Sequence, residues 1–262
     1  MSCKVIAVAN QKGGVGKTTT AVNLSASLAV AEARVLLIDF DPQGNATSGL
    51  GFTADTIKSD IYDVLVNGAD IKESILHTEI EGLDLTPAKI ELSAAEVELI
   101  QELSRETKLK RAIAEIRDNY DYILIDCPPS LGLLTVNALT AADSVLIPLQ
   151  CEYYAMEGLG QLLNTINLIK ENLNPSLVLE GILLTMYDAR NNLSKEVMNQ
   201  VRMHFPDKAF KTIVQRNVSL SEAPSYGKPV ILYQAKSKGS ECYIELAKEM
   251  LNKENKNKQD EA

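Results

Sequence analysis

Apolar residues along this chain form short continuous runs, separated by longer segments with helical spacing. The runs occupy residues 5–9, 35–38, 83–85, 122–125, 144–149 and 178–184. Continuous apolar runs are typical of strands buried on both faces. Apolar positions three or four apart predict helices over residues 19–31, 104–117, 156–173, 191–205 and 241–251. The alternation predicts an α/β fold with a doubly wound, mostly parallel sheet flanked by helices.

No break in composition divides the chain, so we expect a single domain over residues 1–251. Residues 252–262 are polar and are expected to form a disordered tail. The sequence lacks an apolar run long enough for a membrane span, and it starts on a strand rather than a signal peptide. Its four cysteines lie far apart, which argues against a disulfide framework and indicates a cytoplasmic protein.

The segment after the first apolar run is rich in glycine and carries two lysines. Residues 12–19 read Lys-Gly-Gly-Val-Gly-Lys-Thr-Thr, and Gln11 stands where the phosphate-binding pattern G-x-x-x-x-G-K-[ST] has glycine. Such a loop presents backbone N–H groups and a helix N-terminus to an anion. We expect Lys17 at the β- and γ-phosphates, Thr18 at Mg²⁺, and the additional Lys12 at a second site in a partner subunit. The predicted nucleotide-binding residues are Gly13, Gly14, Val15, Gly16, Lys17, Thr18 and Thr19.

Three aspartates follow predicted strands. Asp126 ends the run at 122–125 and precedes Cys-Pro-Pro-Ser, a rigid loop placed to approach a γ-phosphate. Asp39 and Asp41 are two positions apart, so both could face the nucleotide from an extended segment. We assign Asp39 and Asp126, with Thr18, to Mg²⁺, and Asp41 to positioning the attacking water. The predicted catalytic residues are thus Lys12, Lys17 and Asp41.

These motifs together resemble those of the ParA/Soj partitioning ATPases, which have a deviant phosphate-binding loop. Further stretches that match are Gln-Cys-Glu-Tyr-Tyr-Ala-Met-Glu-Gly at 150–158 and Ser-Glu-Ala-Pro-Ser-Tyr-Gly-Lys-Pro at 221–229. The resemblance implies an ATP-bound sandwich homodimer in which Lys12 reaches the partner's nucleotide. It also implies non-specific binding to double-stranded DNA, location on the nucleoid, and hydrolysis stimulated by a ParB/Spo0J-type centromere-binding protein. The adenine pocket that it implies includes Arg216, Asn217 and Pro224.

The charge distribution is uneven. The net charge is −9 overall, but residues 1–185 hold 13 Lys and Arg against 25 Asp and Glu, whereas residues 190–238 hold 9 against 3. The basic segment is a candidate DNA surface, although charge alone leaves a merely solvated face open. The resemblance implies a DNA contact at Arg190, while Ser219 stands where close relatives carry a second arginine. Further candidates are Lys195, Arg202, Lys208 and Lys211.

Three other functions stay open at this point. A MinD-like membrane-cycling ATPase would need a basic amphipathic C-terminal helix, and we expect Tyr243, Leu246, Ala247 and Met250 to pack on the core instead. An iron–sulfur ATPase would need two surface cysteines per subunit, and Cys127 lacks a matching partner. An ATP-dependent regulator or scaffold would share the dimer without needing turnover. No helix-turn-helix is expected before the loop, so operator recognition is not predicted.

Overall fold

A twisted sheet runs through the centre of the molecule. The computed structural model describes residues 3–260, with side chains up to residue 254. In this part the sheet has eight strands in the order β3-β4-β2-β5-β1-β6-β7-β8, and all neighbours are parallel except β3 and β4. The strands are β1 (Lys4–Val8), β2 (Val35–Asp39), β3 (Leu76–His77), β4 (Leu83–Thr86), β5 (Tyr122–Asp126), β6 (Ser144–Gln150), β7 (Val178–Tyr187) and β8 (Ala209–Gln215).

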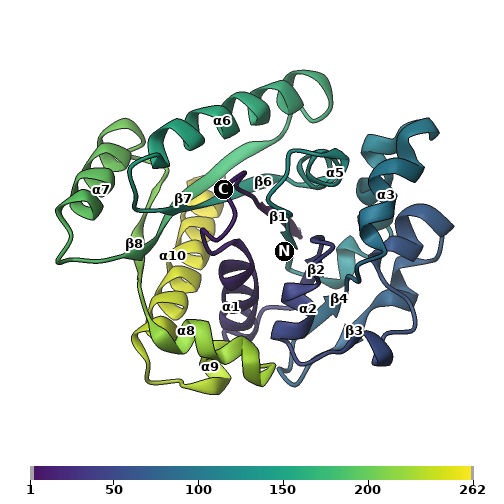
Figure 1. Ribbon diagram of the computed structural model, residues 1–262, viewed down its shortest axis with the longest axis horizontal. Helices are drawn as coiled ribbons and strands as arrows, with labels where there is room; N and C mark the ends of the chain where they lie inside the picture. The colour runs from purple at the N-terminus through teal and green to yellow at the C-terminus, as the bar shows by residue number, and fades with distance from the viewer. Residues whose placement is uncertain (1–2, 261–262) are drawn as a thin grey trace.

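Helices cover both faces of this sheet (Figure 1). The α-helices are α1 (Lys17–Val30), α2 (Asn45–Gly49), α3 (Leu92–Glu98), α4 (Lys108–Ala114), α5 (Leu133–Ala141), α6 (Ala155–Asn172), α7 (Asn192–His204), α8 (Val218–Glu222), α9 (Val230–Tyr233) and α10 (Lys238–Asp260). Short helical turns are η1 (Ala54–Thr56), η2 (Asp63–Asn67), η3 (Ile71–Ser74), η4 (Leu99–Gln101), η5 (Arg105–Thr107), η6 (Arg117–Asn119) and η7 (Ala223–Tyr226).

Alternate strand residues enter two separate cores. In β1, Val5 and Ala7 pack with α3 to α7, whereas Ile6 and Val8 pack with α1 and α10. Because each strand is covered on both sides, its residues are apolar in succession, which is the pattern read from the sequence. The predicted α/β architecture with a mostly parallel, doubly wound sheet is confirmed.

Several elements differ from the sequence-based prediction. β8 escaped notice because it is an edge strand in which Lys211 and other polar residues interrupt the apolar run. α5 was missed because it is buried almost all round, so its apolar residues show no helical period. The helix predicted over 104–117 is divided into η5, α4 and a turn at η6. α3 was also not predicted.

The last helix is longer than expected. α10 begins at Lys238 and continues past Leu251 to Asp260. Its residues Tyr243, Leu246, Ala247 and Met250 are at most 2% exposed and pack in the core with α1, as predicted. Residues 261–262, part of the predicted disordered tail, lie outside the described residues, and the proposed boundary at residue 251 stays a prediction.

The strand register brings the candidate chemistry to one edge. Val8 of β1 and Asp39 of β2 both pair with Asp126 of β5, so all three strands end at the same level. β1 leads directly into the glycine-rich loop and α1. The neighbours of β1 are connected in opposite directions along the sheet, and such a switch point is where open α/β sheets bind ligands.

Candidate functional site

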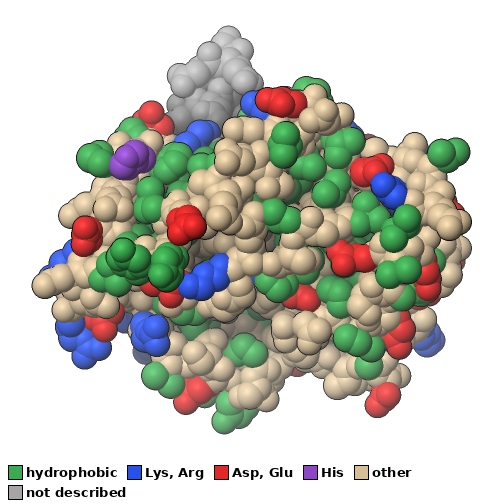
Figure 2. Space-filling model, turned by 45° about the horizontal axis from the view of Figure 1, so that its top comes forward, with side chains coloured by type: hydrophobic (Ala, Val, Ile, Leu, Met, Phe, Trp, Pro, Cys, Tyr) green, Lys and Arg blue, Asp and Glu red, His purple; other side chains and the backbone are tan. Residues whose placement is uncertain are grey.

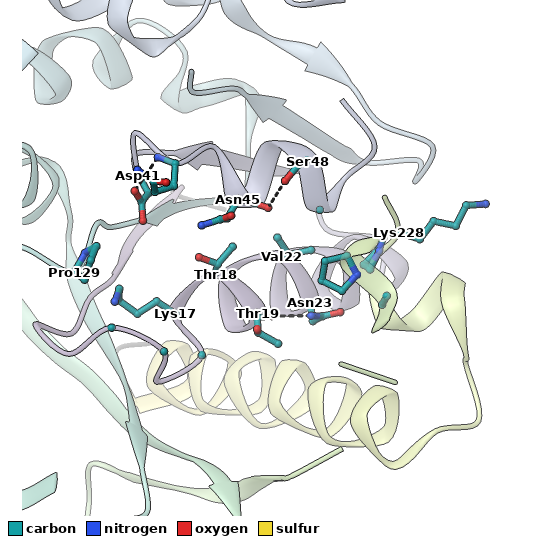
Figure 3. A pocket seen from close by; sticks show the side chains of 18 of the residues that line it. Lys17, Thr18, Thr19, Val22, Asn23, Asp41, Asn45, Ser48, Pro129 and Lys228 are labelled. Atoms are coloured by element: carbon teal, nitrogen blue, oxygen red, sulfur yellow. Dashed lines mark hydrogen bonds between the residues drawn. The ribbon is translucent and has the colours of Figure 1, made fainter. Parts of the chain in front are cut away.

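A cavity of about 510 Å³ lies at the carboxyl ends of these strands. The glycine-rich loop and the start of α1 form its floor, and Asp41 faces Lys17 and Thr18 from another wall (Figure 3). Pro129 of the loop after β5 closes one end, and Pro224, Lys228 and Pro229 close the other. The three sequence motifs, predicted separately, therefore meet in one cavity together with the 223–229 segment.

The loop is held open by hydrogen bonds to neighbouring strands. Asn10 Nδ2 donates to Pro148 O at 2.7 Å, and Asn10 Oδ1 accepts from Lys12 N at 3.0 Å. Thr185 Oγ1 donates to Val15 O at 2.8 Å. Gly14 (φ +74°) and Gly16 (φ +89°) adopt the left-handed conformation that favours glycine. This geometry leaves the N-terminus of α1 facing the cavity, where backbone N–H groups attract an anion.

Lys17 is a nearly buried cation directed into this site. Lys17 is only 6% exposed, and its Nζ donates to Lys12 O at 3.1 Å. Burial lowers the pKa of Lys17, while Asp126 and Asp41 act in the opposite direction. A cation that has lost most of its hydration gains strongly from a bound anion, so Lys17 suits a phosphate group.

Lys12 lies at the rim of the cavity, and its side chain is not directed into the cavity as that of Lys17 is. Its backbone turns with the loop, but its ammonium group pairs with Glu152, which follows β6. The side chain is 49% exposed. A Cβ added at the adjacent Gly13 would meet no atom within 4 Å. Gly13 therefore lines the cavity where it opens to free space, and Lys12 is not among the residues that line the cavity of its own chain.

Asp126 is the most unusual carboxylate of the site. It is fully buried, and neither carboxylate oxygen makes a hydrogen bond of good geometry among the described residues, although the Thr18 hydroxyl lies near enough to lower its pKa. Burial and the neighbouring Asp39 raise its pKa well above the ordinary value. An unpartnered buried carboxylate is costly unless a cation approaches it. The described residues contain no cluster of three or more His, Cys, Asp and Glu that could hold a metal unaided.

Asp39 and Asp41 have different surroundings despite their spacing. Asp39 Oδ2 accepts from Thr47 N and Thr47 Oγ1, both at 2.7 Å, and Asp39 Oδ1 accepts from Asp41 N at 3.2 Å. Burial raises the pKa of Asp39 to about 6. Asp41 lines the cavity and is 7% exposed. The structure thus gives Asp39 a role in holding the 41–47 turn, and its assignment to the metal stays a prediction.

A second cavity of about 280 Å³ adjoins the first. Arg216, Asn217 and Pro224, the predicted base-binding residues, all line it. Asn217 Oδ1 is buried without a hydrogen-bond partner among the described residues. An unused acceptor of this kind can receive an N–H group of a ligand. The two cavities share Gly16, Thr19, Met186 and Pro224.

Sequence reasoning missed two features here. Met186 lines both cavities with φ +50°, an uncommon conformation for a residue with a side chain, and only the three-dimensional path of β7 reveals it. Asn23 links α1 to the start of α9, directly after the 223–229 segment, because its Oδ1 accepts from Val230 N at 2.7 Å. A polar residue on the buried side of a predicted helix was the available signal for Asn23.

The residues proposed for DNA binding lie apart from these cavities. Arg190 follows β7, is 90% exposed in its side chain, and pairs with Asp188 at 2.8 Å. Lys195 and Arg202 are exposed on α7, and Lys211 is exposed on β8. In Figure 2, Lys and Arg side chains gather along the left edge, the side where Figure 1 places α7 and β8. Ser219 is 8% exposed, and its hydroxyl is 2.5 Å from Gln234 Oε1.

A phosphate-binding loop between β1 and α1, with carboxylates at the tips of adjacent parallel strands, defines a P-loop nucleotide-binding domain. A family model described as an AAA domain matches residues 3–179. The chain is 60% identical to the sporulation initiation inhibitor protein Soj of Bacillus subtilis, over 94% of this chain and 98% of that protein. It is 57% identical to the chromosome partitioning protein ParA of Myxococcus xanthus, over 96% and 89%.

A solved structure has the same fold as this chain. It is a Mycobacterium smegmatis protein described as cobyrinic acid a,c-diamide synthase with bound ATP analog and magnesium. The TM-score is 0.82 at 40% identity, and the match covers 94% of this chain and 93% of that chain. The chain belongs to the ParA/Soj family of chromosome-partitioning ATPases.

The surroundings of Cys127 bear on the iron–sulfur function considered above. Cys127 is 1% exposed, so it is not the surface ligand that a cluster shared between subunits requires. Burial and Asp126 also raise the pKa of the Cys127 thiol above its usual range, which disfavours the thiolate that binds metals. Within residues 3–260, no helix is both long and apolar enough to cross a membrane.

Proposed function

We propose that this protein uses ATP binding and hydrolysis to move DNA during partitioning. In this proposal, Mg²⁺-ATP fills the two adjoining cavities, two ATP-bound chains form a sandwich dimer, and the dimer binds double-stranded DNA without sequence preference. A ParB-type centromere-binding protein stimulates hydrolysis and returns the protein to the free monomer. The observation that carries the proposal is the meeting of Lys17, Thr18 and Asp41 in one cavity, with the buried Asp126 carboxylate near Lys17 and Thr18.

The donor set fits a magnesium nucleotide. Mg²⁺ usually keeps several waters and takes one or two protein oxygens together with phosphate oxygens. The Thr18 hydroxyl and the orphaned Asp126 carboxylate can supply those protein oxygens, directly or through water. Bound Mg²⁺ would neutralise charge on the phosphates. Lys17 would bind the phosphates, Asp41 would orient the attacking water, and Asn217 would accept an N–H from the purine.

The rim geometry supports the dimer. Lys12 already turns outward, and Glu152 holds its ammonium group beside the cavity mouth. Gly13 has free space where its side chain would be, so a second chain could approach the loop closely. In the sandwich, Lys12 exchanges Glu152 for the partner's phosphates, which carry more charge.

The basic segment supports the contact with DNA. Arg190, Lys195, Arg202 and Lys211 are exposed cations on neighbouring elements, away from the nucleotide. Non-specific DNA binding needs such phosphate contacts and little else. ATP would make the binding tight by joining two basic surfaces in one dimer, because linked sites bind with greater avidity than single ones.

Co-sedimentation with DNA tests the proposal. The protein is mixed with long double-stranded DNA and either ADP, ATP or a slowly hydrolysed ATP analogue, at several salt concentrations. We expect sedimentation with the analogue, little with ADP, and a steep loss as salt rises. Equal sedimentation in all three states would overturn the proposal. Sedimentation with anionic vesicles, but not with DNA, would instead favour the MinD-like membrane function.

A further inference from the structure

α3 and the turn after it carry apolar residues on two opposite sides. Leu92, Ala95 and Leu99 are at most 1% exposed and pack into the core with α4 and α5. On the other side, Val97, Ile100 and Leu103 are 69%, 55% and 90% exposed. They follow one another at intervals of three, which places the first two on one helix face. We call these three residues the α3 outer face. An apolar surface without a partner of its own marks an interaction site.

The α3 outer face is bordered by more acidic than basic side chains, although Arg105 Nη1 donates to Ile100 O beside it. Residues 90–104 contain four glutamates and no lysine or arginine. Glu91, Glu98 and Glu102 are exposed, and only Glu102 among them pairs with a cation, Lys108 at 3.2 Å. Figure 2 shows acidic and hydrophobic side chains interspersed on the right of the molecule, the side where Figure 1 places α3. Such a surface repels anionic membranes and nucleic acid and attracts a basic apolar segment.

We propose that the α3 outer face binds a basic amphipathic helix of a partner protein. The helix would lay Leu- or Ile-type side chains on Val97, Ile100 and Leu103, and its Lys and Arg side chains would meet Glu91, Glu98 and Glu102. This inference deepens the proposed function, because it places the docking of a partner on the molecule. It needs neither DNA binding nor dimerisation.

One contact connects this surface to the nucleotide cavity. Glu96, also on α3, lies against the backbone of Gly132, where a Cβ would collide with its carboxylate. Gly132 is the N-cap directly before α5, and Pro129 in the same connecting loop lines the nucleotide cavity. Glu96 Oε1 is buried without a hydrogen-bond partner among the described residues. A helix docked on α3 and a nucleotide against Pro129 thus act on the two ends of one short loop.

A designed peptide tests the docking. The probe is an amphipathic 18-residue peptide of Leu and Lys with helical spacing, and the matched probe has Glu in place of Lys. We expect the full chain to bind the Leu–Lys peptide in calorimetry and not the Leu–Glu peptide. The triple variant Val97→Ser, Ile100→Ser, Leu103→Ser should weaken the Kd at least about tenfold, as loss of a central apolar anchor does. Replacing Glu91, Glu98 and Glu102 by Gln should weaken it and flatten its salt dependence.

Matched variants exclude general effects of polarity and charge. Val30, Leu168 and Val178 are exposed apolar residues on other elements, and Glu115, Glu157 and Glu171 are exposed glutamates elsewhere. Replacing the first set by Ser, or the second by Gln, should leave the Kd within about twofold of wild type. Equal weakening by these controls, or equal binding of the Leu–Glu peptide, would overturn the proposal. The melting temperature and the ATP affinity of every variant are measured as well, and only variants that match wild type in both are compared, so that unfolding is not mistaken for lost docking.

The connection to the cavity has its own readout. Because linkage is reciprocal, the peptide Kd should change by the same factor on adding the ATP analogue as the analogue's Kd changes on adding peptide. In the Glu96→Ala variant the peptide should still bind, but its Kd should no longer change when the ATP analogue is added. If the peptide Kd of the wild-type chain were the same with and without the ATP analogue, the connection between α3 and the cavity would be overturned. If the peptide failed to bind while DNA co-sedimentation was intact, this inference would be overturned and the proposed function would stand. If the peptide bound as expected while DNA did not co-sediment, the proposed function would be overturned and the docking site would stand.

Discussion

The nucleotide cavity and the basic α7–β8 surface are built in opposite ways. At the cavity, Lys17, Asp39 and Asp126 are buried, and each has surroundings that fix its position or its charge. At the basic surface, Arg190, Lys195 and Arg202 project into solvent. A buried group must have a partner or bear a desolvation cost, so its chemistry can be read from a few contacts. An exposed cation bears little such cost, and its function depends on the summed charge of many residues.

This difference tells us how each region should fail. A single substitution at the cavity should strongly impair one step, either ATP binding or hydrolysis, because water cannot take over the contact that the buried side chain makes. Neutral single substitutions at the basic surface should give graded, salt-dependent losses, since surface charges are screened within about 8–10 Å at physiological salt, and only a reversal of charge should do more. The predictions below test that contrast, from the largest expected effect to the smallest.

Lys17→Ala should abolish nucleotide binding and everything that depends on it. Loss of one partner of a buried charge pair costs about 2–5 kcal/mol, and every 1.4 kcal/mol is about tenfold in affinity. Burial lowers the pKa of Lys17, whereas its charge stabilises the neighbouring Asp126 carboxylate, so these effects oppose each other and the melting temperature should change little. Calorimetry with ATP and thermal unfolding measure both quantities. ATP affinity equal to wild type would show that the loop does not bind phosphate as proposed.

Asp41→Ala should separate hydrolysis from binding. Asp41 lines the cavity beside Lys17, and its proposed role concerns the attacking water rather than the bound phosphates. Hydrolysis should fall by about 10²–10⁴-fold, while ATP binding and ATP-dependent dimerisation persist. Phosphate release and size-exclusion chromatography with ATP provide the two measurements. Asp39→Ala is the comparison variant: loss of its bonds to Thr47 should lower thermal stability more. Wild-type turnover by Asp41→Ala would assign the water to another residue.

Gly13→Val should bind ATP as a monomer and fail to form the dimer. A Cβ at Gly13 meets nothing within 4 Å in one chain, so a clash arises only when a second chain approaches. Gly14→Val is the matched control. Gly14 has φ +74°, so a branched residue there strains the loop itself and should reduce ATP binding as well. A Gly13→Val dimer as tight as wild type would contradict the sandwich arrangement.

Arg190→Glu should abolish ATP-dependent DNA binding at moderate salt without affecting dimerisation. The variant loses an attraction, gains a repulsion, and leaves Asp188 without its cation. Arg190 holds the pKa of Asp188 down to about 2, and without Arg190 that pKa rises toward its ordinary value, yet the carboxylate stays charged at neutral pH and adds to the repulsion. Lys170→Glu on α6 changes the net charge equally and should bind DNA normally. Similar losses in both variants would mean that overall charge, not this surface, governs DNA binding.

The sequence predicted the cavity far better than its surroundings. Lys17, Asp41 and Asp126 occur in fixed short motifs after apolar runs, so strand register alone brings them together. The α3 outer face has no such pattern. Val97 and Leu99 are both apolar in the sequence, and only the fold shows that Val97 is exposed and Leu99 is buried. β8 and α5 were missed for the same reason: edge position and full burial remove the periodicity that identifies strands and helices.

Ser219 offers the finest test of the contrast between the two regions. Close relatives are expected to carry arginine at this position, yet Ser219 is 8% exposed and bonded to Gln234, whose side chain lies toward solvent. An arginine there must displace Gln234 to reach DNA. Ser219→Arg combined with Gln234→Ala should therefore steepen the salt dependence of DNA binding by one phosphate contact, about 0.9 in log–log terms.

The single variant Ser219→Arg should gain less than the double variant, because Gln234 still occupies the way out. Gln234→Ala alone should leave the salt slope unchanged, since it adds no charge. DNA-binding isotherms at four or more salt concentrations measure all three slopes. If the double variant matched wild type in affinity and slope while Arg190→Glu still bound DNA, the α7–β8 side would not be the DNA surface. The proposed function would then lose its nucleic-acid half, and a scaffold or membrane-cycling role would account better for the same ATP-driven dimer.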